Sequence, residues 1–169
     1  MMQAMIFAAG LGTRLKPLTD SIPKALVEVG GETLLQRTIE RLKACGVKSM
    51  VINVHHFAQA IVDYLQANDN FGVEIAVSDE TQHLLDTGGG LKKAAHLFSS
   101  TANILIHNVD IISNVDLQAF YTHQGQSDAL LLVSQRETKR YLLFNDDMRL
   151  VGWTNVETGE VRSPYLNLN

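Results

Sequence analysis

Two glycines near the N-terminus are followed by cations in a pattern that suits an anionic ligand. Gly10 and Gly12 come directly after an apolar run, and three cations follow them: Arg14, Lys16 and Lys24. Glycines have no Cβ, so the backbone N–H groups of such a turn can face an anion at close range. Fixed cations beside those amides suit a polyphosphate better than a single carboxylate. The stretch therefore predicts a nucleoside triphosphate site.

Two common phosphate-binding patterns do not fit these glycines. The dinucleotide pattern G-x-G-x-x-G is met at Gly10 and Gly12, but Leu15 stands where the third glycine belongs. A Walker A loop needs a Lys-Ser or Lys-Thr pair after its last glycine, and none follows here. What remains is G-x-G-T-R-x-x-P-L-T-x-x-x-P-K, ending at Lys24.

Further candidate residues follow later apolar or loop segments. Asn108 and Asp110 come directly after the apolar run 104–106. A carboxylate there lies at the edge of the sheet where ligands of open α/β folds bind, and Mg²⁺ prefers one or two carboxylates with phosphate oxygens and water. Gly88 opens a predicted helix, so its amide can meet a nucleotide closely. Asp116 is interpreted as a helix cap.

The remaining pattern predicts the elements that must hold these residues together. Apolar runs predict buried strands over 4–9, 50–54, 73–77, 103–107 and 129–134, with a short strand or hook over 25–29. Helices are predicted from Thr33, where Gln36 completes a capping box, from Phe57, from Gly88 and from Asp116. This alternation predicts a three-layer α/β sandwich with a mostly parallel, Rossmann-like sheet. Antiparallel hairpins are predicted from Tyr141 onward, with turns over 145–147 and 158–159.

Composition narrows the function classes. A chain of 169 residues predicts a single domain, and the net charge of -4 argues against a nucleic-acid partner. No apolar run approaches the ~18 residues of a membrane span. Cys45 is the single cysteine, so no internal disulfide is expected and a reducing, cytoplasmic location fits. The six histidines show no metal-ligand spacing.

The long pattern from Ala8 to Lys24 closely resembles the signature of the sugar-1-phosphate nucleotidyltransferases. Within them, it is most similar to the compact bacterial N-acetylmuramate-1-phosphate uridylyltransferase-like group. Two further segments, 86–90 (D-T-G-G-G) and 108–110 (N-V-D), extend the resemblance over essentially the whole chain. It implies the nucleotide-diphospho-sugar transferase fold. It also implies transfer of a nucleotidyl group from a nucleoside triphosphate, UTP or dTTP, to a sugar 1-phosphate, with Mg²⁺ as cofactor and pyrophosphate as product.

The resemblance also implies roles for individual residues. Arg14 is expected to reach the β- and γ-phosphates, Lys24 the transferring phosphate, and Asp110 the metal, and these three form the expected catalytic set. The expected nucleotide-binding set is Ala9, Gly10, Leu11, Gly12, Thr13, Arg14, Lys24, Gly88 and Asn108. The loop 80–82 is expected to help read the nucleobase. Val109 departs from the glycine that the family usually has before its aspartate.

Relatives supply a second metal carboxylate and much of the sugar pocket from sequence later than any in this chain. The last residues, 165–169, resemble the start of another strand. We therefore expect a domain that is incomplete at its C-terminus, binding nucleotide with little turnover. Two alternatives stay open: a non-catalytic nucleotide-binding regulatory module of the same fold, and a cytidylyltransferase acting on a non-sugar phosphate such as phosphocholine.

Overall fold

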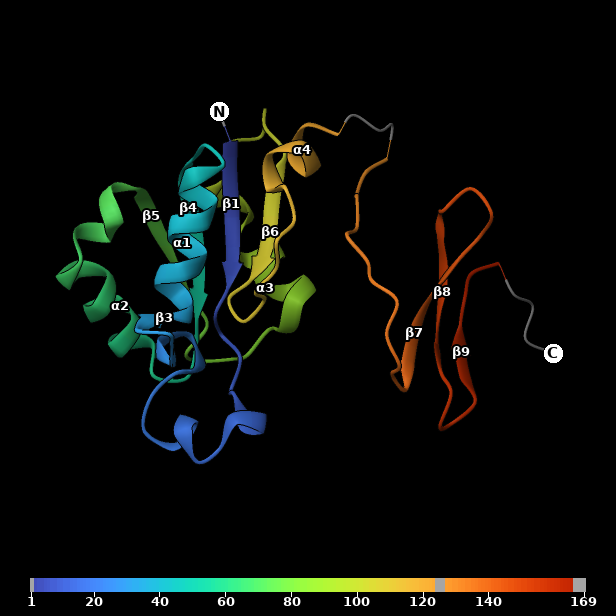
Figure 1. The fold of residues 1–169 in the computed structure, drawn as a ribbon, viewed down its shortest axis with the longest axis horizontal. Helices are drawn as coiled ribbons and strands as arrows, with labels where there is room; N and C mark the ends of the chain where they lie inside the picture. Colours follow the sequence, from blue (N-terminus) through green and yellow to red (C-terminus); the bar gives the residue numbers. More distant parts are fainter. Residues whose placement is uncertain (1, 124–126, 166–169) are drawn as a thin grey trace. The chain divides into compact units, whose positions relative to one another are not determined.

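The computed structural model describes residues 2–123 and 127–165 (Figure 1). The chain divides into two compact units, Met1–Gln124 and Gly125–Asn169. Whether they belong to a single nucleotidyltransferase domain stays a prediction. Among the described helices, none is both long and apolar enough to cross a membrane.

The first unit is built on a four-stranded sheet in which every neighbouring pair is parallel. The strand order is β5-β4-β1-β6, and the strands are β1 (Met2–Phe7), β4 (Val47–Val54), β5 (Glu74–Asp79) and β6 (Ile104–Asn108). Phe7 pairs with Asn53 on one side and with Asn108 on the other. The carboxyl ends of these strands are therefore level, and the segments that follow them meet at one edge.

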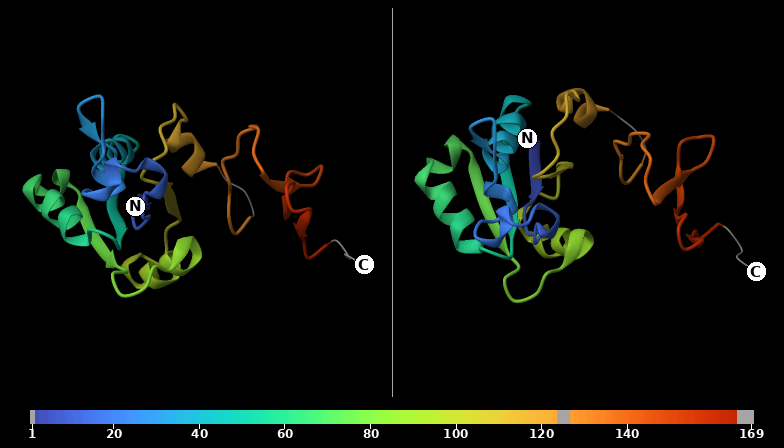
Figure 2. Two further views of the ribbon diagram at one scale, coloured as in Figure 1. Left: turned by 90° about the horizontal axis from the view of Figure 1, so that it is seen from below. Right: turned by 60° about the horizontal axis from the view of Figure 1, so that its bottom comes forward.

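Helices cover both faces of this sheet, as Figure 2 shows. One face, with Ile6 and Ile52, packs against α1 (Leu34–Ala44), α2 (Ala58–Ala67) and α4 (Leu117–Thr122). The other face, with Met5 and Val51, packs against α3 (Asp86–Ala94). The alternation arises because successive side chains of a strand point to opposite faces. The predicted three-layer α/β sandwich is confirmed.

Thr33 caps the start of α1 as predicted, but the Gln36 side chain, which was expected to complete a capping box, instead accepts a hydrogen bond from the Tyr64 hydroxyl at 3.1 Å. The Thr33 hydroxyl accepts a hydrogen bond from the backbone N–H of Gln36 at 3.0 Å. On this helix, Leu35, Ile39 and Leu42 are fully buried, in line with the apolar spacing of the sequence. The cap fixes where α1 begins and therefore which of its side chains reach β6.

The segment between β1 and α1 is mostly turns. It holds the 3-10 helices η1 (Thr13–Leu15), η2 (Leu18–Asp20) and η3 (Lys24–Leu26), then the short strands β2 (Glu28–Val29) and β3 (Glu32–Thr33). Of the strand or hook expected over 25–29, only 28–29 pair as a strand, across the turn at Gly30 and Gly31. Ala25 is instead fully buried in a 3-10 turn. Two further 3-10 elements are η4 (Asp69–Gly72) and η5 (Ala95–Leu97).

The second unit carries an antiparallel sheet ordered β7-β8-β9, as expected from the hairpin patterns. Its strands are β7 (Arg140–Phe144), β8 (Leu150–Asn155) and β9 (Glu160–Arg162). The strand predicted over 129–134 is wrong: these residues join no strand pair among the described residues, and Leu131 and Leu132 are 48% and 56% exposed. An apolar run becomes a strand only where a neighbour completes its backbone hydrogen bonds. The strand start expected over 165–169 falls, from residue 166 on, outside the described residues.

Candidate active site

A cavity lies at the carboxyl edge of the parallel sheet. Its volume of about 210 Å³ is below the ~300–1,000 Å³ typical of ligand pockets, so it would enclose only part of a nucleoside triphosphate. Its walls come from the ends of four strands, the start of α3 and η3. The lining residues are Phe7, Ala8, Ala9, Gly10, Lys24, Asn53, Glu80, Leu84, Asp86, Thr87, Asn108, Val109 and Asp110.

The cavity gathers about half of the residues predicted from the sequence. Five members of the expected sets line it: Ala9, Gly10, Lys24, Asn108 and Asp110. The others do not line it: Leu11, Gly12, Thr13, Arg14 and Gly88. Arg14 lies exposed in η1, and Gly88 is exposed on α3 directly after the lining residue Thr87. Their contacts with a nucleotide stay a prediction.

The segment that follows β1 and carries Gly10 and Gly12, which we call the glycine loop, folds back on itself around Gly12. This residue has φ +67°, and a Cβ there would lie 2.9 Å from Thr19 Cγ2 and 3.2 Å from Lys24 Cβ. The hydroxyl of Thr19, itself buried, donates to the Gly12 carbonyl at 2.8 Å. Both the backbone conformation and the close approach require glycine. Thr19 was not singled out from the sequence, although it is the threonine of the P-L-T element in the signature.

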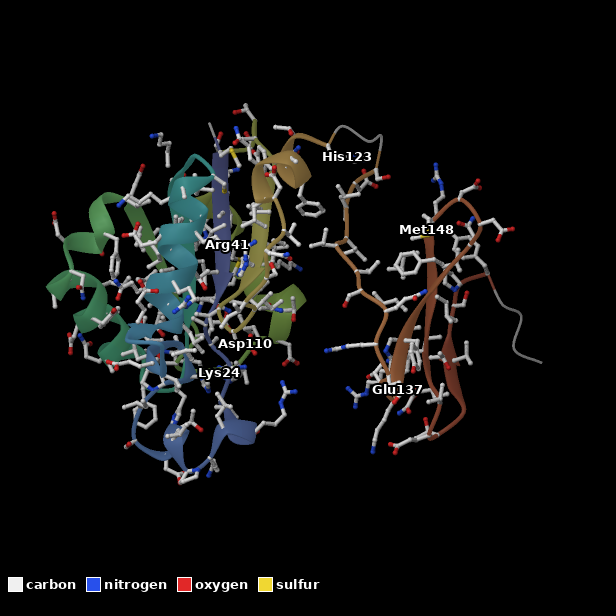
Figure 3. The ribbon with its side chains drawn as sticks, viewed as in Figure 1. Lys24, Arg41, Asp110, His123, Glu137 and Met148 are labelled. Carbon is white, nitrogen blue, oxygen red and sulfur yellow. The ribbon has the colours of Figure 1, made fainter. Side chains whose placement is uncertain are left out.

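Lys24 and Asp110 form an ion pair beside the cavity (Figure 3). Lys24 Nζ donates to Asp110 Oδ2, and the two side chains are 17% and 36% exposed. Lys24 belongs to η3 and lies between two buried residues, Pro23 and Ala25. Asp110 follows β6 at the sheet edge. Two of the three residues that the sequence analysis expected to be catalytic are therefore direct neighbours.

Strand β1 and helix α1 together hold the chain on both sides of Asp110. Before it, the Val109 N–H donates to the Phe7 carbonyl at 3.2 Å, and the Thr38 hydroxyl contacts the Val109 carbonyl at 3.2 Å. After it, the Arg41 guanidinium donates to Ser113 Oγ at 2.9 Å and to the Val115 carbonyl at 2.7 Å. Figure 3 labels Arg41 above Asp110. These anchors fix the position of the carboxylate, and nothing in the local pattern of α1 pointed to them.

Asn53 and Glu80 were not among the predicted site residues, although the loop that begins at Glu80 was expected to help read the base. Glu80 is fully buried, and both of its carboxylate oxygens accept hydrogen bonds from the protein. Its neighbours Thr81 and Gln82 are exposed. A buried charged residue is rare unless it is paired, and here the partners are the Asn53 amide and the backbone N–H of Leu85.

The electrostatics of the neighbouring groups follow from burial and hydrogen bonding. Burial lowers the pKa of His107, whose Nδ1 lies 2.7 Å from the Asn108 carbonyl. The pKa of Asp79 is lowered because its carboxylate accepts from the N–H of Thr81 at 2.7 Å. Asp116 caps α4 as predicted, accepting from the Ala119 N–H at 2.9 Å.

A metal ion at this site would have few protein side chains as ligands. Within 2–123 and 127–165, no group of three or more His, Cys, Asp or Glu residues could hold a metal ion. Asp110 offers one carboxylate at the cavity edge. One carboxylate fits Mg²⁺, which takes most of its remaining ligands from phosphate oxygens and water.

Comparisons with known proteins agree with this geometry. A family model described as "Nucleotidyl transferase" matches residues 3–143. The chain is 44% identical over 111 residues to an N-acetylmuramate alpha-1-phosphate uridylyltransferase of Caulobacter vibrioides, covering 64% of this chain and 46% of that protein. It is 33% identical over 145 residues to a mannose-1-phosphate guanyltransferase of Gibberella zeae, covering 83% and 40%. The chain thus spans about half the length, or less, of these relatives.

A solved structure extends the likeness to three dimensions. The crystal structure of HddC from Yersinia pseudotuberculosis complexed with GMP-PN superposes with a TM-score of 0.75 at 26% identity. The match covers 92% of this chain and 69% of that one. The shared fold therefore extends over most of the chain.

Proposed function

The chain belongs to the nucleotidyl transferase family, and from that premise we propose that it serves the transfer of a nucleotidyl group from a nucleoside triphosphate to a sugar 1-phosphate. The observation that carries the proposal is the Lys24–Asp110 pair at a cavity bounded by the glycine loop and the start of α3. A cation and a metal-binding carboxylate at one point suit a reaction between two phosphate groups.

In the proposed reaction, an oxygen of the sugar phosphate attacks the α-phosphorus of the triphosphate. A new phosphorus–oxygen bond forms, the bond from the α-phosphorus to the α–β bridging oxygen breaks, and pyrophosphate leaves with that electron pair. No side-chain nucleophile is needed, so the protein contributes alignment and charge stabilisation. We assign the α-phosphate to Lys24, whose charge gains value as negative charge builds up in the transition state.

The triphosphate tail is assigned to the exposed part of the glycine loop. The cavity is too small for a whole nucleotide, and Arg14 lies outside it on η1. A guanidinium at that position suits bidentate contact with β- and γ-phosphate oxygens. Ala9, Gly10, Leu11, Gly12 and Thr13 would supply the backbone that faces the phosphates, with Gly88 and Asn108 on the nucleoside side.

Asp110 is the residue that we assign to Mg²⁺. When bound, this ion supplies charge neutralisation between the crowded phosphates. Lys24 and Asp110 satisfy each other in the free protein, so each is held in place until its own ligand arrives. The chain's part is thus to present one carboxylate and one ammonium at a fixed position.

UTP or dTTP is the proposed donor. Support comes from the uridylyltransferase of Caulobacter vibrioides, whose identity to this chain exceeds that of the guanyltransferase. The test is a pyrophosphate-release assay with Mg²⁺, in which ATP, CTP, GTP, UTP and dTTP are each paired with several sugar 1-phosphates and with phosphocholine.

The outcomes separate the candidate functions. Release with UTP or dTTP and a sugar 1-phosphate supports the proposal, whereas release only with CTP and phosphocholine supports the cytidylyltransferase alternative. Binding of a triphosphate without release from any pair refutes the transferase and leaves a regulatory module.

A further inference from the structure

Two nucleotide-facing segments of the first unit are far apart in sequence but connected through buried polar groups. The glycine loop starts at Ala8, and the start of α3 is reached at Leu85. Between them lie Asn53, at the end of β4, and Glu80, which follows β5. Asn53 and Glu80 are 2% and 0% exposed. These two buried polar side chains are in contact and form a hydrogen-bonded link between the two segments.

The link runs through three hydrogen bonds. The Ala8 N–H donates to Asn53 Oδ1 at 2.8 Å, and Asn53 Nδ2 donates to Glu80 Oε1 at 2.8 Å. The Leu85 N–H then donates to Glu80 Oε2 at 3.1 Å. Position 90 needs a glycine to leave room for the Glu80 carboxylate, because a Cβ there would lie 2.7 Å from Glu80 Oε1. We call the chain of groups Ala8–Asn53–Glu80–Leu85 the relay.

The direction of the relay is fixed at both ends. A backbone N–H can only donate, so Ala8 compels Asn53 to present its oxygen and therefore to point its NH₂ at Glu80. Leu85 also donates, so the side chain at position 80 must accept at both of its oxygens. A carboxylate meets this demand and an amide does not, since glutamine would place an NH₂ against a donor.

We propose that Asn53 and Glu80 are positioning residues that hold the glycine loop and the start of α3 at the separation a nucleotide requires. The inference rests on the proposed function. A buried donor facing a donor leaves both groups without a partner, which is costly in the protein interior. Glu80→Gln therefore forces one end of the relay apart and changes the spacing of the two segments.

The test is a pair of reciprocal substitutions. Asn53→Asp places two carboxylates against each other, and Glu80→Gln places two amides against each other. The double variant Asn53→Asp with Glu80→Gln restores every bond: Ala8 donates to Asp, the Gln amide donates to Asp, and the Gln oxygen accepts from Leu85. It also leaves the net charge unchanged.

Each single variant is expected to weaken triphosphate binding by about tenfold, equivalent to about 1.4 kcal/mol, and the double variant to return to within about threefold of the parent. Affinities for ATP, CTP, GTP, UTP and dTTP with Mg²⁺ are measured by calorimetry, at a temperature where thermal melting shows every variant folded. Asp79→Asn is the matched control, because it makes the same change at an exposed neighbour, and we expect parental affinity.

Two readouts distinguish positioning from other roles. The KM for the triphosphate should rise in the single variants while the KM for the sugar phosphate stays constant, which a general loss of stability would not produce. The order of preference among the five triphosphates should not change. A changed order means that Glu80 contacts the base directly, and overturns the inference.

The inference and the proposed function fail in different ways. Parental affinity in Glu80→Gln, or a double variant no better than the single ones, overturns the relay while the function stands. A parent chain that binds no triphosphate refutes the proposed function and the nucleotide-positioning role with it. In that case the free energies of unfolding of the variants test the hydrogen bonds of the relay. If the double variant is no more stable than the single variants, these hydrogen bonds do not exist.

Discussion

Gly12→Ala tests whether the glycine loop is held as tightly as the structure implies. Two separate penalties act at this position: the left-handed backbone at φ +67°, and a Cβ only 2.9 Å from Thr19 Cγ2. The backbone conformation costs an L-residue roughly 1–2 kcal/mol. Forcing an extra methyl into packed surroundings costs about 1–3 kcal/mol. Replacing glycine also restricts the unfolded chain, which returns about 0.4–1 kcal/mol.

These terms predict that Gly12→Ala lowers the free energy of unfolding by about 3 kcal/mol. Two other glycines separate the contributions. Gly31 has φ +84° with nothing within 4 Å of its Cβ position, so Gly31→Ala should cost about 1 kcal/mol. Gly10 has neither feature, so Gly10→Ala should be neutral or stabilise by up to about 1 kcal/mol.

The assay is urea unfolding followed by the helical circular dichroism signal. All α-helices of the described residues lie in the first unit, so this signal reports the unit that contains the loop. The decisive variant is Gly12→Ala combined with Thr19→Ser, which removes the clashing Cγ2 and keeps the hydroxyl bond to the Gly12 carbonyl. We expect the second substitution to recover about 1–2 kcal/mol relative to additivity. Additive effects, or equal losses in Gly12→Ala and Gly31→Ala, would refute the argument that Thr19 packs rigidly against the loop.

Two further predictions concern charge. Lys24→Ala should reduce turnover by roughly 10²–10³-fold, which is the usual effect of removing one transition-state donor. Lys16→Ala is the control: it breaks only an exposed pair with Asp20 and should change turnover less than about twofold. Similar small effects of both substitutions in a pyrophosphate-release assay would show that Lys24 takes no part in the mechanism. Burial lowers the folded-state pKa of His107 below 6.5, so the unfolded chain binds the extra proton first and stability is lost as the pH falls below 6.5. His107→Gln should flatten that decline in urea unfolding measured across this pH range, and an unchanged slope would contradict the assignment.

Local sequence patterns predicted the first unit well because its elements carry their own signals. The Thr33 cap, the buried face of α1 and the glycine turn after Val29 depend on neighbours a few residues away. The strands of a parallel sheet are continuous apolar runs, which the sequence displays directly. The run over 129–134 has the same composition, yet it does not form a strand in the second unit. Composition alone does not reveal whether a partner strand is present.

The candidate site was predictable only where charge and glycine gather in one segment. Lys24 and Asp110 were found because each belongs to a compact motif, and their contact follows once β1 and β6 pair. Thr38 and Arg41 act on the Asp110 segment from α1, where a threonine and an arginine look like ordinary surface residues of a helix. Their roles come from tertiary packing, which the spacing within one helix does not encode.

Asn53 and Glu80 show most clearly why long-range polar groups escape sequence reasoning. Each is a single polar residue at a strand end, a place where exposure is the ordinary expectation. The backbone N–H groups of Ala8 and Leu85 point into the protein where the chain leaves the sheet beside the cavity. Asn53 and Glu80 are buried because they accept the hydrogen bonds of these two groups. A backbone donor that faces the interior must find an acceptor. The segments that border the cavity therefore create the demand for acceptors at Asn53 and Glu80, and we expect a substitution that suits either segment alone to fail unless it preserves acceptors at both ends of the relay.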